Sequence, residues 1–195
     1  GYQIDLTKDH TFPIPKALNA NEFLNNKLKV GIAPFAKHVG KVYPLDLMQK
    51  IIAYLSQNNQ VFLFGFGDEL KILEKWESSY KNVECPSSNI NFSKEIQLIS
   101  NLDLMISMDS ANGHIASIYN VPVITIWGLT HPYTGFSTFN SVEENQFTVD
   151  RTKFPLIPSS IYGNKKINGY EESMRSIDLN GILYRADKIL NQTSS

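Results

Sequence analysis

Apolar residues form two kinds of pattern, which alternate along this chain. Short continuous runs cover residues 29–35, 61–66, 82–85, 103–108, 121–127 and 146–149. Runs of this length between proline, glycine, asparagine or aspartate are typical of strands that a sheet buries on both faces. We therefore predict a strand at each run, with 82–85 and 146–149 as minor strands and the latter at an edge.

Segments with apolar residues at helical spacing separate these runs. The first begins near Pro44, because proline suits the first turn of a helix, and ends before Asn58. Its apolar positions are Met48, Ile51, Ile52 and Leu55. Four further helices are predicted from apolar residues at the same spacing. The second helix contains Leu70, Leu73 and Trp76, and the third, capped by Ser93, contains Ile96, Ile99 and Leu102. The fourth contains Ala111, His114, Ile115 and Ile118, and the last contains Ile182, Leu183, Ala186, Ile189 and Leu190.

Strands that alternate with helices imply right-handed crossovers and a mostly parallel sheet. The predicted fold class is therefore α/β: a Rossmann-like, doubly wound sheet with helices on both faces. Residues 1–28 contain scattered apolar residues among prolines and asparagines, and we expect a linker or edge segment there. Residues 29–195 form the predicted domain, in which 151–170 are a long loop and 177–190 the final helix.

The composition is that of an ordinary globular protein, with 195 residues, 42% hydrophobic and 19% charged. The 18 basic and 19 acidic residues give a formal charge of -1, so bulk charge offers no attraction to nucleic acid. Any anion that the protein binds must therefore be bound by local geometry.

Cysteine usage and hydropathy narrow the setting of the protein. The single cysteine, Cys85, cannot form an internal disulfide, and no cysteine and histidine cluster has zinc spacing, so a reducing cytoplasm is expected. No apolar run reaches the roughly 20 residues that a membrane-spanning helix needs. The chain begins with Gly1, which favours a processed chain or a piece of a longer one.

The most informative polar stretch is Asp109 to His114, between a predicted strand and a predicted helix. A strand that turns directly into a helix exposes backbone N–H groups, which suit a phosphate. The competing interpretation is structural: Asp109 and Ser110 are good helix caps, and Gly113 can simply allow close packing. The Asp109 carboxylate would repel a phosphate, so we expect it to accept hydrogen bonds from sugar hydroxyls or to orient the loop. For His114, a buried imidazole bonded to a neighbouring loop is favoured over a general base.

Two other loops also follow predicted strands. Lys37, His38 and Lys41 crowd the first loop, where a lysine can neutralise a diphosphate or simply be solvated. The segment Gly65 to Glu69 contains glycines and carboxylates but lacks both the dinucleotide fingerprint and the P-loop motif. A carboxylate there can hold a ribose diol, although Asp68 can equally cap the next helix.

The loop from Trp127 to Phe136 supplies aromatic and hydroxyl side chains after another predicted strand. Such side chains suit sugars or nucleobases, but a packed loop explains them equally well. The motifs of serine hydrolases, kinases and zinc peptidases are all missing from the sequence.

Taken together, these motifs resemble the carboxyl-terminal, donor-binding half of the heptosyltransferase family. The resemblance covers about residues 29–136. It rests on Ala33-Pro-Phe-Ala-Lys-His, Lys41-Val-Tyr-Pro, Phe64-Gly-x-Gly-Asp-Glu, Asp109-Ser-x-Asn-x-His-x-Ala-Ser and Val121-Pro-Val-x-x-Ile-Trp-Gly-x-Thr-His-Pro. These enzymes add heptose from an ADP-activated donor to lipopolysaccharide, and their GT-B fold has two Rossmann-like domains that face each other across a cleft.

The resemblance implies a set of donor-binding residues. Lys41 matches a lysine that lies near the donor phosphates. Glu69, or else Asp68, matches a carboxylate near the ribose, and residues 109–114 match the segment that surrounds the diphosphate sugar. Ala111 replaces a glycine of many members, and Gly113 comes later, so the amide that approaches the phosphate is left open. The implied set is Lys41, Asp68, Glu69, Asp109, Ser110, Ala111, Asn112, Gly113, His114, Thr130 and His131.

The resemblance also implies what this chain lacks. The catalytic base of the family, an aspartate, belongs to the amino-terminal acceptor domain, so no catalytic residue, metal or other cofactor is expected on this chain. Residues 158–165 resemble a tail that carries cysteines in some members, and those cysteines are absent here.

The expected function is donor binding for an inverting, metal-independent glycosyltransferase of bacterial surface glycans. Its partners would be a nucleotide sugar such as ADP-heptose, the missing domain and a lipid-linked glycan acceptor. The expected location is the cytoplasm, with peripheral attachment to the inner membrane as an option for the intact enzyme. The alternatives are a nucleotide-sugar epimerase or hydrolase of the same fold, and a non-catalytic nucleotide-binding or interaction module.

Overall fold

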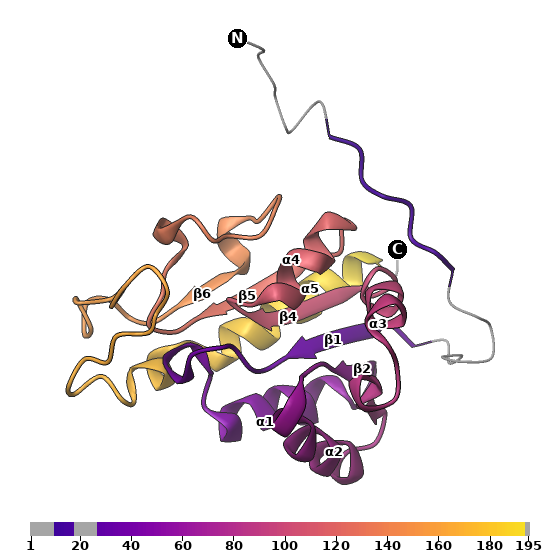
Figure 1. The fold of residues 1–195 in the computed structure, drawn as a ribbon, viewed down its shortest axis with the longest axis horizontal. Coiled ribbons are helices and arrows are strands. Elements are labelled where there is room, and N and C mark those ends of the chain that lie inside the picture. Colours follow the sequence, from indigo (N-terminus) through magenta and orange to yellow (C-terminus); the bar gives the residue numbers. More distant parts are fainter. Residues whose placement is uncertain (1–9, 18–26, 194–195) are drawn as a thin grey trace.

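The computed structural model describes residues 10–17 and 27–193, which include one six-stranded sheet (Figure 1). Every strand pairs with its neighbours in parallel. In spatial order the strands are β3 (Val83–Glu84), β2 (Gln60–Leu63), β1 (Lys29–Ala33), β4 (Leu104–Met108), β5 (Val123–Trp127) and β6 (Gln146–Thr148). The predicted Rossmann-like α/β class is confirmed.

Within the described residues, four α-helices connect strands, a fifth follows β6, and together they cover both faces of the sheet (Figure 1). They are α1 (Leu45–Leu55), α2 (Leu70–Ser79), α3 (Phe92–Ile99), α4 (Ala111–Ile118) and α5 (Leu179–Thr193). Buried side chains of α1, α2 and α5 form one core with the sheet, and those of α3 and α4 form a second core. Alternate residues of β4 enter opposite cores, Ile106 the first and Met105 the second, as the period of a strand requires.

The order of the strands places the ligand-binding edge of the sheet. After β1 the chain moves outward through β2 and β3, then returns to β4 on the other side of β1. Strand β1 therefore lies between β2 and β4, and the helices that follow these two strands, α2 and α4, pack on opposite faces of the sheet. In open α/β sheets, ligands bind at the carboxyl ends of the strands at such a switch point. The loops after β1, β2 and β4 meet there.

Two local predictions about helices are wrong. Asn91, rather than Ser93, caps α3, because its side-chain oxygen accepts the backbone N–H of Lys94 at 3.0 Å. Of the three residues predicted to be buried, Ile99 and Leu102 are buried, although Leu102 lies beyond the helix, whereas Ile96 is only half-buried.

The predicted apolar face of α4 is also wrong. Its buried residues are Gly113, Ala116 and Ser117, whereas Ala111 and Ile118 are exposed. A Cβ atom on Gly113 would lie 2.9 Å from Ser107 Oγ of β4. The helix thus approaches the sheet through small residues, and apolar periodicity alone selects the wrong face.

The segments outside the sheet and helices are partly described. Of the predicted linker at 1–28, residues 1–9 and 18–26 lie outside the described residues. The side chains of Gln97 and Asn101 donate to the carbonyls of Ala17 and Lys16 at 2.6 and 2.8 Å, so residues 10–17 contact the end of α3. Among the described residues, no helix has the length and apolar character needed to cross a membrane.

Candidate functional site

Lys41, Asp109 and Thr130 come together at the carboxyl edge of the sheet. Lys41 Nζ lies 2.6 Å from Asp109 Oδ2, and Thr130 Oγ1 donates to the same oxygen at 3.2 Å. The side chains of Lys41 and Asp109 are only 14% and 6% exposed, and Thr130 is fully buried. Because the pair is shielded from water, its electrostatic interaction is stronger than that of a surface ion pair. Asp109 therefore orients Lys41 and contacts the loop after β5 through Thr130, while its predicted contact with sugar hydroxyls stays a prediction.

Close backbone contacts between two loops support the cluster of Lys41, Asp109 and Thr130. The N–H of Leu129 donates to the carbonyl of Gly40 at 2.8 Å, which ties the loop after β5 to the loop after β1. A Cβ atom on Gly128 would lie 2.3 Å from the same carbonyl oxygen. The contact thus requires glycine at position 128.

Gly163 covers the cluster from a distant part of the chain. It adopts a φ of +65°, and a Cβ atom there would lie 2.8 Å from Thr130 Cγ2 and 3.0 Å from Lys41 Cγ. The N–H of Ser159 donates to the carbonyl of Leu129 at 2.9 Å, so the long loop after β6 packs on the site. Nothing in the sequence pattern around Gly163 indicated this contact.

The start of α4 lies directly beyond Asp109. Ser110 is the N-cap residue in an extended conformation, but its side chain does not cap the helix. Its Oγ lies instead 3.1 Å from Ser107 Oγ. The capping interpretation of Asp109 and Ser110 is therefore wrong, since the Asp109 carboxylate faces Lys41. The first N–H groups of α4, at Ala111, Asn112 and Gly113, have no intrahelical partner by the geometry of a helix start.

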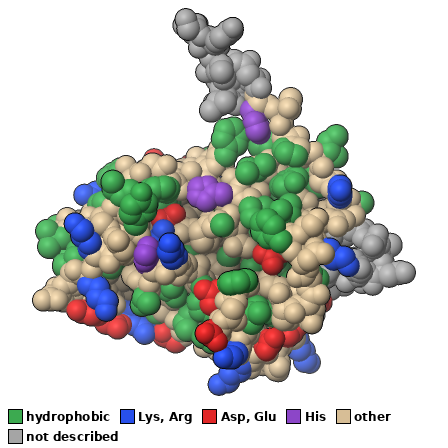
Figure 2. All heavy atoms as spheres, viewed as in Figure 1, with side chains coloured by type: hydrophobic (Ala, Val, Ile, Leu, Met, Phe, Trp, Pro, Cys, Tyr) green, Lys and Arg blue, Asp and Glu red, His purple; other side chains and the backbone are tan. Residues whose placement is uncertain are grey.

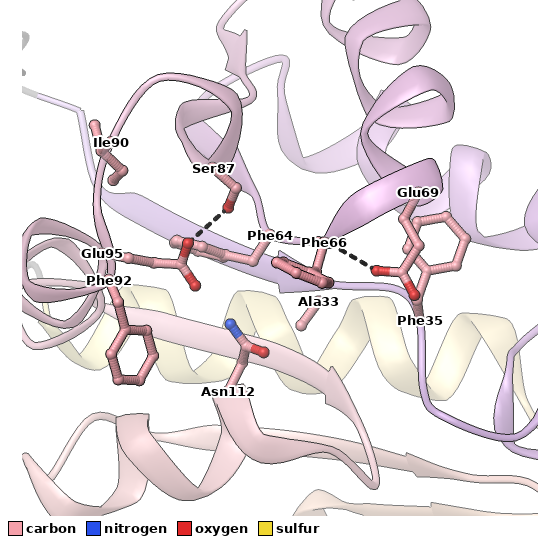
Figure 3. A pocket seen from close by; sticks show the side chains of 11 residues that line it. Ala33, Phe35, Phe64, Phe66, Glu69, Ser87, Ile90, Phe92, Glu95 and Asn112 are labelled. Carbon is pink, nitrogen blue, oxygen red and sulfur yellow. Dashed lines mark hydrogen bonds between the residues drawn. The ribbon is translucent and has the colours of Figure 1, made fainter.

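A cavity of about 490 Å³ opens on the other side of α4, between the ends of β1 and β2 and the start of α3 (Figure 3). Phenyl rings and carboxylates form its walls, and Asn112 points toward it from α4 (Figure 3). The lining residues are Ala33, Phe35, Phe64, Gly65, Phe66, Glu69, Ser87, Ile90, Phe92, Glu95 and Asn112. The structure thus brings Glu69 and Asn112 of the predicted set into one cavity.

The two neighbouring carboxylates predicted for the ribose differ sharply. Glu69 accepts the backbone N–H of Phe66 at 2.9 Å and lines the cavity. The Asp68 side chain is 96% exposed, pairs with Lys71 at 2.7 Å and does not line the cavity. The predicted capping of α2 by Asp68 is wrong, because the N-cap residue of this helix is Glu69 and no side chain caps it.

Sequence reasoning missed the far wall of this cavity. Ser87 donates to Glu95 at 2.9 Å, and both residues line the wall with Ile90 and Phe92 (Figure 3). The segment after β3 carried one usable signal, Pro86, which marks a turn at a strand end.

The two predicted histidines occupy different environments. His131 is 8% exposed, its Nδ1 accepts the backbone N–H of Tyr133 at 3.2 Å, and its pKa is lowered by burial and by the nearby charge of Arg151. A neutral imidazole in this position stabilises the loop after β5. His114 is half-buried, and its imidazole makes no hydrogen bond within the described part of the chain, so the predicted bond to a neighbouring loop is not found.

The acidic, histidine and cysteine side chains are dispersed. Within residues 10–17 and 27–193, no three of them are grouped in a way that could hold a metal ion. Cys85 is buried, and burial together with Glu77 and Glu74 raises its pKa to about 11, so the thiol stays protonated.

Comparisons with known proteins agree with this architecture. The chain is similar to the ADP-heptose LPS heptosyltransferase II of E. coli, with 16% identity and a TM-score of 0.62 over 89% of this chain and 50% of that one. It is similar to a family 9 glycosyltransferase of Veillonella parvula, with 12% identity and a TM-score of 0.66 over 89% and 48% of the two chains. The iron-containing dodecameric glycosyltransferase TibC of enterotoxigenic E. coli gives 15% identity and a TM-score of 0.62 over 94% and 49%.

At these identities the structural matches establish the fold, and the chain spans about half the length of the structures that it matches. A search of curated proteins found no match. The family model described as glycosyltransferase family 9 (heptosyltransferase) matches residues 4–154, which is most of the chain. The chain therefore belongs to the glycosyltransferase family 9, the heptosyltransferase family.

Proposed function

We propose that this chain binds the nucleotide diphosphate sugar donor of a family 9 glycosyltransferase. The observation that carries the proposal is the shielded Lys41–Asp109 pair directly before α4, a helix whose first backbone N–H groups have no partner within the helix. The Lys41 ammonium group and these N–H groups favour an anion, and the pair is already oriented by Thr130. A diphosphate is the part of the donor that fits there.

The remaining parts of the donor follow from the neighbouring features. The cavity beside α4 has aromatic walls that would suit a flat base, and the Glu69 carboxylate on its wall would accept hydrogen bonds from ribose hydroxyls. Asp109 keeps a second oxygen, Oδ1, for a hydroxyl of the sugar. The solved relatives include WaaC of E. coli with ADP and TibC with ADP-D-beta-D-heptose, which supports an adenine nucleotide as the first candidate.

In the intact enzyme, these residues would act on the leaving group. A hydroxyl of the acceptor, deprotonated by a base outside this chain, would attack the anomeric carbon as the bond to the diphosphate breaks. Lys41 and the amides of α4 would stabilise the negative charge that develops on the diphosphate. Epimerisation or hydrolysis would need an acid and a base at the reacting sugar, whereas here Lys41 and Asp109 are bonded to each other, which favours a role in binding.

Calorimetric titration with ADP, GDP, UDP and CDP tests the proposal directly. We expect saturable binding with preference for ADP. Lys41→Ala should weaken ADP binding about tenfold, the loss of one charge-assisted contact worth ~1.4 kcal/mol. The matched control is Lys71→Ala, which removes an exposed lysine that pairs with the exposed Asp68. A folded chain that binds no nucleotide at millimolar concentration would contradict donor binding.

Asp109→Asn separates the two roles of Asp109. If Oδ1 contacts the sugar, affinity for the nucleotide sugar should fall while affinity for the free nucleotide is retained. An equal loss for both ligands would show that Asp109 acts only by orienting Lys41.

A further inference from the structure

A second cavity lies beside Gly163 and shares no lining residue with the aromatic cavity. Its volume is about 640 Å³, and it lies between the loop at residues 37–46 and the segment 163–175. Leu129 and Met174 contribute an apolar floor, so the cavity is a hollow of mixed character rather than a flat surface. None of the predicted donor-binding residues lines it.

Positive charge is concentrated at one end of this cavity. Lys37, Lys165 and Lys166 are exposed on its rim, with the half-buried His38 beside them. Within the described residues, none of these three lysines has a carboxylate partner within ion-pair distance. In Figure 2, lysine and arginine side chains gather around a histidine at the left of the molecule, where the loops after β1 and β6 meet in Figure 1.

Three carboxylates, Asp46, Glu171 and Glu172, also line the cavity, and each of them has a partner within the chain. Arg175 makes two bonds of 2.9 Å to Asp46 and also pairs with Glu172. Glu171, a further carboxylate on this wall, accepts the backbone N–H of Gly169 at 3.2 Å. The acidic side chains of the lining are thus engaged, whereas the lysines on the rim have no such partner in the described part of the chain.

A buried hydroxyl supplies a second, independent indication of a ligand. Ser173 lines the cavity and is only 1% exposed. Its Oγ has no hydrogen-bond partner within the described residues, although buried polar atoms are normally paired. An acceptor oxygen delivered from the cavity would satisfy this hydroxyl.

We propose that this cavity binds an anionic sugar: its phosphate or carboxylate group contacts Lys37, Lys165 and Lys166, and another of its oxygens accepts a hydrogen bond from Ser173 Oγ. Gly163 lines the cavity and also packs on Lys41 and Thr130, so this residue separates the cavity from the Lys41–Asp109 pair. This placement makes the ligand an anionic group of the acceptor glycan. The identification of the ligand as acceptor rests on the proposed function, whereas binding of the anion does not.

The test is a nuclear magnetic resonance titration of the full 195-residue chain with inorganic phosphate and, separately, with glucuronate, each with and without saturating ADP. We expect saturable shifts at residues 37–40, 163–166 and 173 that persist when ADP is present. Tighter binding of phosphate or of glucuronate decides which anion the site prefers. Shifts confined to residues 109–114 and abolished by ADP would overturn the second site while leaving donor binding intact.

Matched variants separate specific binding from general charge. The double variant Lys165→Gln/Lys166→Gln should weaken anion binding about fivefold, the effect expected when exposed charge contacts are lost. Lys75→Gln/Lys188→Gln, which changes two exposed lysines on α2 and α5, should leave it unchanged. Equal weakening in both double variants would mean that only the overall charge matters, which contradicts the proposal.

Ser173→Ala tests the buried hydroxyl without a change of charge. It should weaken anion binding several-fold while the resistance of the chain to urea is retained, because no internal hydrogen bond is lost. Unchanged affinity in a folded Ser173→Ala protein would remove Ser173 from the site. ADP affinity should be the same in all these variants, so failure of the anion site and failure of the donor site are distinguishable.

Discussion

On one side of the start of α4, Lys41, Asp109 and Thr130 are almost enclosed and bonded to one another. On the other side, Phe66 and Phe92 are 87% and 65% exposed around an open cavity. In the first region, contacts within the chain fix the positions of the polar side chains, whereas the second region exposes apolar side chains to water. Charges that stabilise a diphosphate must be positioned before the ligand arrives, because their reorganisation would reduce their effect. Aromatic walls can adjust to a flat ligand at little cost, so they need not be enclosed in advance.

The enclosed region should be sensitive to small steric changes. Gly128→Ala places a Cβ atom 2.3 Å from the Gly40 carbonyl oxygen and 2.7 Å from Met174 Sδ. Because a backbone atom cannot move away as a side chain can, we expect a loss of about 3 kcal/mol in the free energy of unfolding. Urea denaturation measures this loss.

Gly135→Ala is the control for Gly128→Ala. Gly135 has a φ of +81° and open space around its Cβ position, so alanine there adds backbone strain without a steric clash. Its cost should be about 1 kcal/mol. If Gly128→Ala costs no more than Gly135→Ala, the loops after β1 and β5 are less tightly joined than the contact distances indicate.

The exposed region should show the opposite behaviour. Phe66→Ala should change the free energy of unfolding by less than about 0.5 kcal/mol, because the ring is mostly exposed. It should weaken ADP binding about fivefold, since an aromatic contact to a base contributes ~1 kcal/mol. Calorimetry measures the affinity, and Tyr184→Ala, an exposed aromatic on α5, serves as the control. A large loss of stability without loss of affinity would reverse the distinction between the two regions.

The smallest expected effect concerns pH and the loop that carries Thr130. Burial, and secondarily Arg151, lowers the pKa of His131, so the folded chain binds this proton less readily than the unfolded chain. The resulting stabilisation is complete above the unfolded value of about 6.5 and is lost as the pH falls below it. Urea unfolding should therefore show a decrease from about pH 7.5 to about pH 5.5 that is smaller in His131→Asn. Equal decreases in both proteins would contradict this role.

The predictability of this protein from sequence varies with the element. The strands at 103–108 and 121–127 are continuous apolar runs between polar turns, and β4 and β5 lie within them. The helix with Met48, Ile51 and Ile52 is also found, as α1, because a wide apolar stripe has one way to face the sheet. The face of α4 is mispredicted because Gly113, Ala116 and Ser117 are buried for their small size, which hydrophobic spacing does not register.

The site follows the same division. Lys41 and Asp109 were singled out from their positions after strands and Thr130 from the family resemblance, and a parallel sheet brings such positions to one edge. Their ion pair and hydrogen bond were not predicted, and neither was the separation of Glu69 from Asp68. Adjacent residues at the start of a helix point in different directions, so their roles depend on the angle at which that helix packs.

By itself, the sequence determined the α/β class, the strand positions and the loops that carry polar residues, because burial on two faces and helical periodicity leave direct marks on residue order. Only the tertiary structure decided that Asp109 binds Lys41, that Gly163 lies between this pair and a second cavity, and that Ser173 lines that cavity without a partner. Those contacts join loops far apart in the chain. Their geometry depends on the packing of the whole sheet, which no local pattern of residues records.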